Sequence, residues 1–281
     1  MREFVDIGHE SDGMKKSIGI FDSGIGGMTL LHQALVSLPD EKYIFYADTD
    51  NVPYGTKSRE QVVELVDGVM QFMIAHDCKA VVIACNTATA AAAKIMREKY
   101  PIPIIGIEPA VKPAVAESHG KRVMVVATPL TVKEKKLRTL LERVDDEHLV
   151  DLLALPKLVE FAERGEFVSD AVETYLRDSL LDYKIENYGE LVLGCTHFNY
   201  FKDSFRKILP KDIHIIDGTE GTIRQLARVL KEQNQLESAN AFDKENDTRV
   251  RYFYSGRELK ETDELEYMKQ LHERLEEMRR L

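Results

Sequence analysis

The chain has 281 residues, with 38 basic and 48 acidic side chains and a formal net charge of −10. This length suits about two domains, and the acidic balance argues against nucleic acid as a main partner, because phosphate binding depends on clustered lysine and arginine. No apolar run is long enough to span a membrane, and the first residues mix both charges without an apolar core, so we expect neither a membrane segment nor a signal peptide.

The predicted elements alternate along the chain between short apolar strands and amphipathic helices. Strands are expected at 17–21, 43–47, 80–84, 103–107, 122–127, 191–194 and 213–217, and helices at 28–38, 59–76, 87–100, 109–118, 131–144 and 220–233. Such alternation with nearly continuous apolar strands is typical of parallel sheets that are covered on both faces. We therefore predict an α/β protein built from two α/β units.

The boundaries of these units are placed where the chain crosses between them, near 109–113 and again near 217–222. The predicted organisation is an N-terminal extension (1–16), a first domain (17–111 plus 220–256), a second domain (112–219) and a charged C-terminal helix (257–281). Apolar side chains repeat along that helix at helical spacing, at Leu265, Met268, Leu271, Leu275 and Met278. We expect this stripe to dock on the body of the protein, the alternative being a partner-binding helix or a dimer helix, so that a homodimer is possible.

Two of the three cysteines occupy the same local pattern. Cys85 and Cys195 each follow an apolar strand that closes on a small residue, and each precedes polar residues that can begin a helix. Ligands of parallel sheets bind beyond the carboxyl ends of strands, and helix N-termini favour a thiolate or a substrate carboxylate. Cys78 is expected to be an inert buried thiol, and the sparse count indicates free thiols in a reducing, cytoplasmic compartment.

Two thiols that face one cleft could form a redox pair, bind zinc with His197, or act as acid and base. The chain has no C-x-x-C motif, and Cys-x-His is not a usual zinc spacing. We favour the third interpretation, in which one thiolate removes a proton from a substrate carbon while the other thiol delivers one to the opposite face. That chemistry inverts a stereocentre and needs neither a cofactor nor a metal.

Polar groups near other strand ends are candidates for the same site. Asp22 and Ser23 follow the first strand and precede a glycine-rich turn. This turn lacks the dinucleotide and P-loop patterns, so it predicts backbone amides that can approach a small anion. Asp22 could hold an ammonium group or orient a cysteine, Tyr54-Gly55 could edge the cleft, and His197 is favoured as catalytic because it lies beside Cys195.

The segments FDSGIGG, ADTDNVPYG, ACNTATA, GIEPAVKPA and LGCTH, in this order, closely resemble bacterial glutamate racemase over about residues 17–256. The resemblance implies two similar α/β domains, each a mainly parallel sheet flanked by helices, with the active site at their interface. It also implies cofactor-independent interconversion of L- and D-glutamate, which supplies D-glutamate for peptidoglycan. A racemase for aspartate or another acidic amino acid, or a non-catalytic amino-acid-binding protein on this scaffold, are the alternatives.

The resemblance also implies residue roles. Cys85 would act on D-glutamate and Cys195 on L-glutamate, and Glu163 or Glu160 would help to position the histidine. The family usually has CTHYP where this chain has CTHFN, so Asn199 replaces a proline. The catalytic assistants would be Asp22 and His197, and the substrate-binding residues would be Asp22, Ser23, Tyr54, Gly55, Asn86, Thr87, Thr196 and His197.

Overall fold

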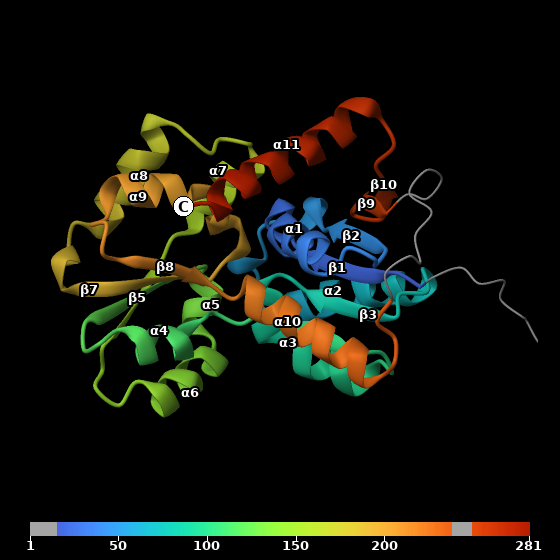
Figure 1. Cartoon of the computed structure of the whole chain (residues 1–281), viewed down its shortest axis with the longest axis horizontal. Coiled ribbons are helices and arrows are strands. Elements are labelled where there is room, and N and C mark those ends of the chain that lie inside the picture. Colours follow the sequence, from blue (N-terminus) through green and yellow to red (C-terminus); the bar gives the residue numbers. More distant parts are fainter. Residues whose placement is uncertain (1–15, 238–248) are drawn as a thin grey trace, which may run out of the picture.

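The computed structural model describes residues 16–237 and 249–281, so residues 1–15 of the predicted N-terminal extension (1–16) lie outside the described residues. Within these residues the strands form two sheets, each with helices on its faces (Figure 1). The first sheet has the order β10-β9-β2-β1-β3-β4, and β10 pairs antiparallel to β9 while the other pairs are parallel. Its strands are β1 (Ile18–Asp22), β2 (Tyr43–Ala47), β3 (Ala80–Ile83), β4 (Ile104–Gly106), β9 (Val250–Tyr254) and β10 (Arg257–Glu258).

The second sheet is parallel throughout and has the order β6-β5-β7-β8. Its strands are β5 (Arg122–Ala127), β6 (Val150–Ala154), β7 (Tyr188–Leu193) and β8 (His214–Asp217). This order repeats the order β2-β1-β3-β4 of the first sheet, so β1 corresponds to β5 and β3 to β7. The prediction of two similar, mainly parallel α/β units is therefore confirmed.

Helices connect the strands and cover the sheets. An apolar core that includes side chains from both sheets, such as Phe45 and Leu191, makes the two units continuous with each other. The 3₁₀ helices are η1 (Ile25–Gly27), η2 (Thr49–Asn51), η3 (Tyr54–Thr56), η4 (Ile185–Asn187) and η5 (Thr196–Phe201). The α-helices are α1 (Met28–Ser37), α2 (Arg59–Ala75), α3 (Asn86–Lys99), α4 (Val111–Glu117), α5 (Pro129–Lys133), α6 (Lys135–Val144), α7 (Pro156–Glu163), α8 (Asp170–Leu180), α9 (Lys202–Ile208), α10 (Thr219–Glu232) and α11 (Thr262–Arg279).

Several elements differ from the sequence-based expectation. The single helix expected at 131–144 is divided into α5 and α6, because Glu134 between them is extended and the Thr128 hydroxyl caps α5 separately. Strand β6 was not predicted, since its side chains are only half-buried and its apolar run is interrupted by Asp151, which pairs with Arg122. The C-terminal helix begins at Thr262 instead of 257, because residues 257–258 form β10.

The C-terminal helix α11 docks through one face, as expected, and runs from the β9–β10 edge of the first sheet towards the second sheet (Figure 1). It packs on α1 and on η5. Met268, Leu271, Leu275 and Met278 are buried in this contact, whereas Leu265, which was expected in the same stripe, is 41% exposed. Within the described residues, no helix is long and apolar enough to cross a membrane.

Candidate active site

The two cysteines singled out from the sequence lie at corresponding places in the two sheets. Cys85 follows β3 and Cys195 follows β7, the strands that match in the repeated order. Both side chains are 6% exposed. Cys85 is the N-cap of α3, and its Sγ accepts a hydrogen bond from the Ala88 N–H at 3.4 Å. Cys195 precedes η5, which is a 3₁₀ helix that leads into α9.

Asp22 makes polar contacts with residues that neighbour each of the two thiols. It ends β1 and is fully buried, and its carboxylate accepts from the Ser23 N–H at 2.8 Å and from the Thr196 hydroxyl at 3.1 Å. The Ser23 hydroxyl is in turn 3.8 Å from Cys85 Sγ. Burial raises the pKa of Asp22, and this effect exceeds the opposing influence of His197 and of the Ser23 N–H. The carboxyl group can therefore carry a proton more readily than an exposed aspartate.

His197 links Cys195 to a carboxylate. Its Nδ1 is 3.8 Å from Cys195 Sγ and 4.0 Å from Asp22 Oδ2, and its Nε2–H donates to Glu163 Oε1 at 2.6 Å. Burial lowers the pKa of His197, but the contacts with Cys195 and Glu163 outweigh that effect and raise the pKa well above its usual value. Glu163, at the end of α7, makes this contact, whereas Glu160 on the same helix is exposed.

The Cys85 thiol has a different electrostatic environment. Burial and the neighbouring Asp22 raise its pKa well above the usual value, and the charge of Cys195 acts in the same direction. The two thiols therefore lie within electrostatic reach of each other. Cys85 is held in its protonated form, while Cys195 has an imidazole beside it that readily accepts a proton.

The glycine-rich turn after β1 directs a backbone N–H at an anionic group, and this group is the carboxylate of Glu163 in the same chain. The Ile25 N–H donates to Glu163 Oε1 at 2.8 Å. A Cβ on Gly24 would lie 1.9 Å from Glu163 Oε1, and one on Gly26 would lie 2.3 Å from His197 Nδ1. The absence of side chains at these two positions lets the turn of the first sheet approach the carboxylate and the imidazole of the second.

The other predicted site residues are also buried around the thiols. The Tyr54 hydroxyl donates to Asp48 Oδ2 at 2.6 Å, and η3, which carries Gly55, packs on α5. Asn86 Oδ1 has no hydrogen-bond partner among the described residues. The Thr196 hydroxyl binds Asp22, as described above.

Two threonines that the sequence analysis did not identify lie against Thr87. Its hydroxyl is 2.9 Å from that of Thr128 and 3.2 Å from that of Thr131, so hydroxyl groups from both units meet beside α3. The repeat offers a signal that could have found Thr128, since it follows β5 as Ser23 follows the corresponding strand β1.

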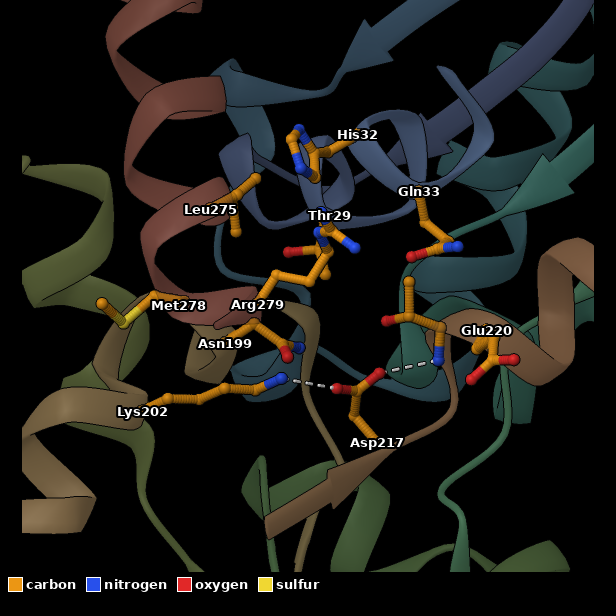
Figure 2. Close-up of a pocket in the computed structure, with 11 residues that line it drawn as sticks. Thr29, His32, Gln33, Asn199, Lys202, Asp217, Glu220, Leu275, Met278 and Arg279 are labelled. Carbon is orange, nitrogen blue, oxygen red and sulfur yellow. Dashed lines mark hydrogen bonds and ion pairs between the residues drawn. The ribbon is translucent and has the colours of Figure 1, made fainter. Parts of the chain in front are cut away.

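A separate cavity of about 170 Å³ lies behind this site, among α1, η5, α10 and α11. Figure 2 shows Thr29 and Asn199 in its wall and the ion pair between Lys202 and Asp217. Thr29 Oγ1 and Asn199 Nδ2 both donate to the carbonyl of Thr196, at 3.2 and 3.4 Å. Asn199, which stands where the resemblance leads one to expect proline, therefore supports the backbone next to Cys195. No cluster of metal-ligating side chains occurs among residues 16–237 and 249–281.

Comparison with known proteins shows the family to which the chain is similar. The family model for Asp/Glu/hydantoin racemase matches residues 28–226. The glutamate racemase of Lachnospira eligens is 51% identical over 94% of this chain and 99% of its own length. The crystal structure of Escherichia coli glutamate racemase in complex with L-glutamate and the activator UDP-MurNAc-ala superimposes with a TM-score of 0.77 at 29% identity, covering 93% of this chain and 96% of that one.

The crystal structure of the Francisella tularensis glutamate racemase in complex with D-glutamate has a TM-score of 0.76 at 28% identity, over 92% of this chain and 94% of that one. These matches extend across both sheets and both cysteine-bearing strand ends. The chain therefore belongs to the Asp/Glu/hydantoin racemase family.

Proposed function

We propose that this protein interconverts L- and D-glutamate by a cofactor-independent, two-thiol mechanism, and that it supplies D-glutamate for peptidoglycan in the cytoplasm. The relatives that are about half identical over nearly the whole chain are glutamate racemases, which favours glutamate over aspartate as the substrate. The observation that carries the mechanism is the placement of Cys85 and Cys195 at corresponding strand ends, with Asp22 near Cys85 and His197 beside Cys195.

In the direction from L- to D-glutamate, Cys195 first transfers its proton to His197, whose raised pKa favours this step. The Cys195 thiolate then removes the α-proton, so the Cα–H bond breaks, an S–H bond forms and the electron pair moves into the α-carboxylate as an enolate. On the opposite face Cys85 releases its proton to Cα, and its S–H bond is replaced by a new Cα–H bond. The product is D-glutamate, and Cys85 is left as a thiolate.

Before the next cycle in the same direction, the Cys85 thiolate must regain a proton and the His197 imidazolium must release one to solvent. Asp22 is suited to reprotonate Cys85, because burial raises its pKa and its carboxyl group lies next to Cys85. The Ala88 N–H stabilises the thiolate in the meantime, as helix N-termini generally do. In the reverse direction the Cys85 thiolate removes the α-proton of D-glutamate and Cys195 reprotonates the carbon.

Fixed dipoles around the thiols would bind the substrate, since the protein as a whole is acidic like its substrate. The unpartnered Asn86 Oδ1 is a buried acceptor that an α-ammonium group would satisfy. The N–H groups and hydroxyls of Ser23, Tyr54, Gly55, Thr87 and Thr196 would stabilise the two carboxylates and the enolate charge. Because these groups are buried, the two units must separate before the substrate can reach them.

Proton exchange tests the reaction and its substrate. The protein is incubated with L-glutamate, and separately with L-aspartate, in D₂O, and deuterium at the α-carbon is followed by NMR together with optical rotation. We expect L-glutamate to lose its rotation while it gains α-deuterium. Faster exchange on aspartate would replace the substrate assignment, and no exchange on either amino acid would favour a non-catalytic binding protein.

Cysteine substitutions test the two-thiol mechanism. Cys85→Ala and Cys195→Ala should each abolish racemisation, since each removes the acid or base on one face of Cα. Cys78→Ala is the matched control, because that thiol is buried against Met73 and burial raises its pKa to about 12. The control should retain wild-type turnover. Undiminished turnover in either of the other variants would refute the mechanism.

A further inference from the structure

The segment after Cys195 contains a buried tyrosine that reaches across to the other unit. Tyr200, in η5, is fully buried, and its hydroxyl donates to the carbonyl of Ile25 at 3.0 Å. Ile25 lies in η1, the glycine-rich turn of the first unit. Burial raises the pKa of Tyr200 well above its usual value, so the hydroxyl remains a neutral donor at physiological pH.

Ile25 is bound at both of its polar backbone groups by the second unit. Its carbonyl accepts from Tyr200, and its N–H donates to Glu163 Oε1 at 2.8 Å. The same Glu163 oxygen accepts from His197 Nε2 at 2.6 Å. A continuous path of hydrogen bonds therefore leads from the Tyr200 hydroxyl, through the backbone of Ile25, to the carboxylate that contacts the histidine.

Tyr200 is itself held firmly from the far side. Its ring stacks on Phe167 with a centroid distance of 4.8 Å and an interplanar angle of 22°. Its carbonyl accepts from Arg274 Nη2 of α11 at 2.7 Å, and the same guanidinium pairs with Asp203 at 2.8 Å. The C-terminal helix thus fixes the backbone of Tyr200, and the ring stacking fixes the direction of its hydroxyl.

We infer that Tyr200 is a positioning residue, which sets the geometry of Glu163 and His197 by holding the Ile25 turn against the second unit. This inference rests on the proposed role of His197 as the partner of Cys195. Without the hydroxyl, the Ile25 carbonyl keeps only the Met28 N–H of its own unit as a donor, so the turn loses its hydrogen bond to Tyr200 of the second unit and can shift. Movement of the turn displaces the Ile25 N–H and loosens the contact between Glu163 and His197.

The test is Tyr200→Phe, which removes one oxygen and keeps the ring. Tyr43→Phe is the matched control, because the Tyr43 hydroxyl also donates to buried backbone carbonyls, those of Ala34 and Leu38, but has no connection to Glu163. Thermal unfolding should show similar small losses of stability in both variants. The charged or titratable groups that face His197 are Glu163 of α7, Asp22 of β1 and the adjacent Cys195, and neither substitution alters them.

Two readouts are measured as a function of pH. The first is kcat/KM for glutamate. Its fall at alkaline pH should occur about half a pH unit lower in Tyr200→Phe, so kcat/KM of the variant should be about threefold below that of the wild type at pH values above this transition. The second is an NMR titration of the His197 imidazole, identified by the signal that is missing in His197→Gln. The imidazole should titrate at lower pH in Tyr200→Phe and at the wild-type pH in Tyr43→Phe.

The NMR titration separates this inference from the proposed function, because it needs no turnover. If the wild-type protein does not racemise glutamate, the proposed function fails while the titration still reports on Tyr200. If the imidazole titrates identically in the wild type and in Tyr200→Phe, or shifts equally in both tyrosine variants, the positioning role is wrong. Should Tyr200→Phe fail to fold, Arg274→Met disturbs the same path at the Tyr200 carbonyl and should produce a smaller shift in the same direction.

Discussion

Replacement of Glu163 by glutamine is the most informative single perturbation of the site. The substitution keeps an oxygen that can accept from His197 Nε2 and from the Ile25 N–H, but it removes the negative charge. Hydrogen bonds to charged groups contribute about 1.5–3 kcal/mol and neutral ones about 0.5–1.5, so the protonated imidazole loses about 1–1.5 kcal/mol. One pKa unit corresponds to about 1.4 kcal/mol. The pKa of His197 should therefore fall by about one unit.

The assay is the pH dependence of kcat/KM for L-glutamate, followed by circular dichroism. The alkaline limb should move down by about one unit in Glu163→Gln, because the imidazolium that accompanies the Cys195 thiolate is lost at lower pH. Glu160→Gln is the control, since Glu160 is exposed on the same helix. An unmoved limb in Glu163→Gln, or an equal shift in the control, would refute the reasoning.

The same substitution predicts a change in stability with a defined pH dependence. Because the pKa of His197 is raised in the folded protein, the stabilisation from its protonation is complete below the unfolded value of 6.5 and is lost as pH rises through the folded value. The stability loss in Glu163→Gln, measured by urea unfolding, should thus be largest below about pH 6.5. A loss that grows with rising pH would contradict the assignment of His197 as protonated.

Two further pairs of substitutions test the turn and the helices. Gly26→Ala should lower kcat more than about 100-fold, since its Cβ would lie 2.3 Å from His197 Nδ1. Gly68→Ala in α2, where the space is open, should retain activity and add about 0.5–1 kcal/mol of stability. Leu275→Ala in α11 should cost about 2–5 kcal/mol in urea unfolding. Leu265→Ala, at a position that is 41% exposed, should change stability by less than about 0.5 kcal/mol.

The buried strands and the two cysteines could be predicted because their signals are local. The apolar runs at 43–47, 80–84 and 122–127 are long enough to identify central strands of parallel sheets, and the structure has a strand at each of them, namely β2, β3 and β5. The edge strand β6 and the strand β9, which only the two-residue β10 separates from the edge of its sheet, carry weaker patterns. Both are partly exposed and contain charged side chains, Asp151 and Arg251. Their existence depended on neighbours that are distant in the sequence.

Contacts between the units could not be predicted from local patterns. Glu163 and Glu160 are one helical turn apart, and only the packing of α7 against η1 and η5 decides which one meets His197. Thr128 could not be predicted for the same reason, because its link to the site is a contact between its hydroxyl and that of Thr87 on the other unit. The glycines after β1 have a defined purpose only once Glu163 and His197 are in place beside them.

The amino-acid sequence by itself determined the α/β class, the two strand-end cysteines and the polar residues that accompany them, because hydrophobic periodicity and motif spacing are written along the chain. The tertiary structure alone decided which charges face each thiol. The proton affinities of Cys85, Asp22 and His197 arise from burial and from partners brought together across the two units. No single segment of the sequence specifies this burial or these partners.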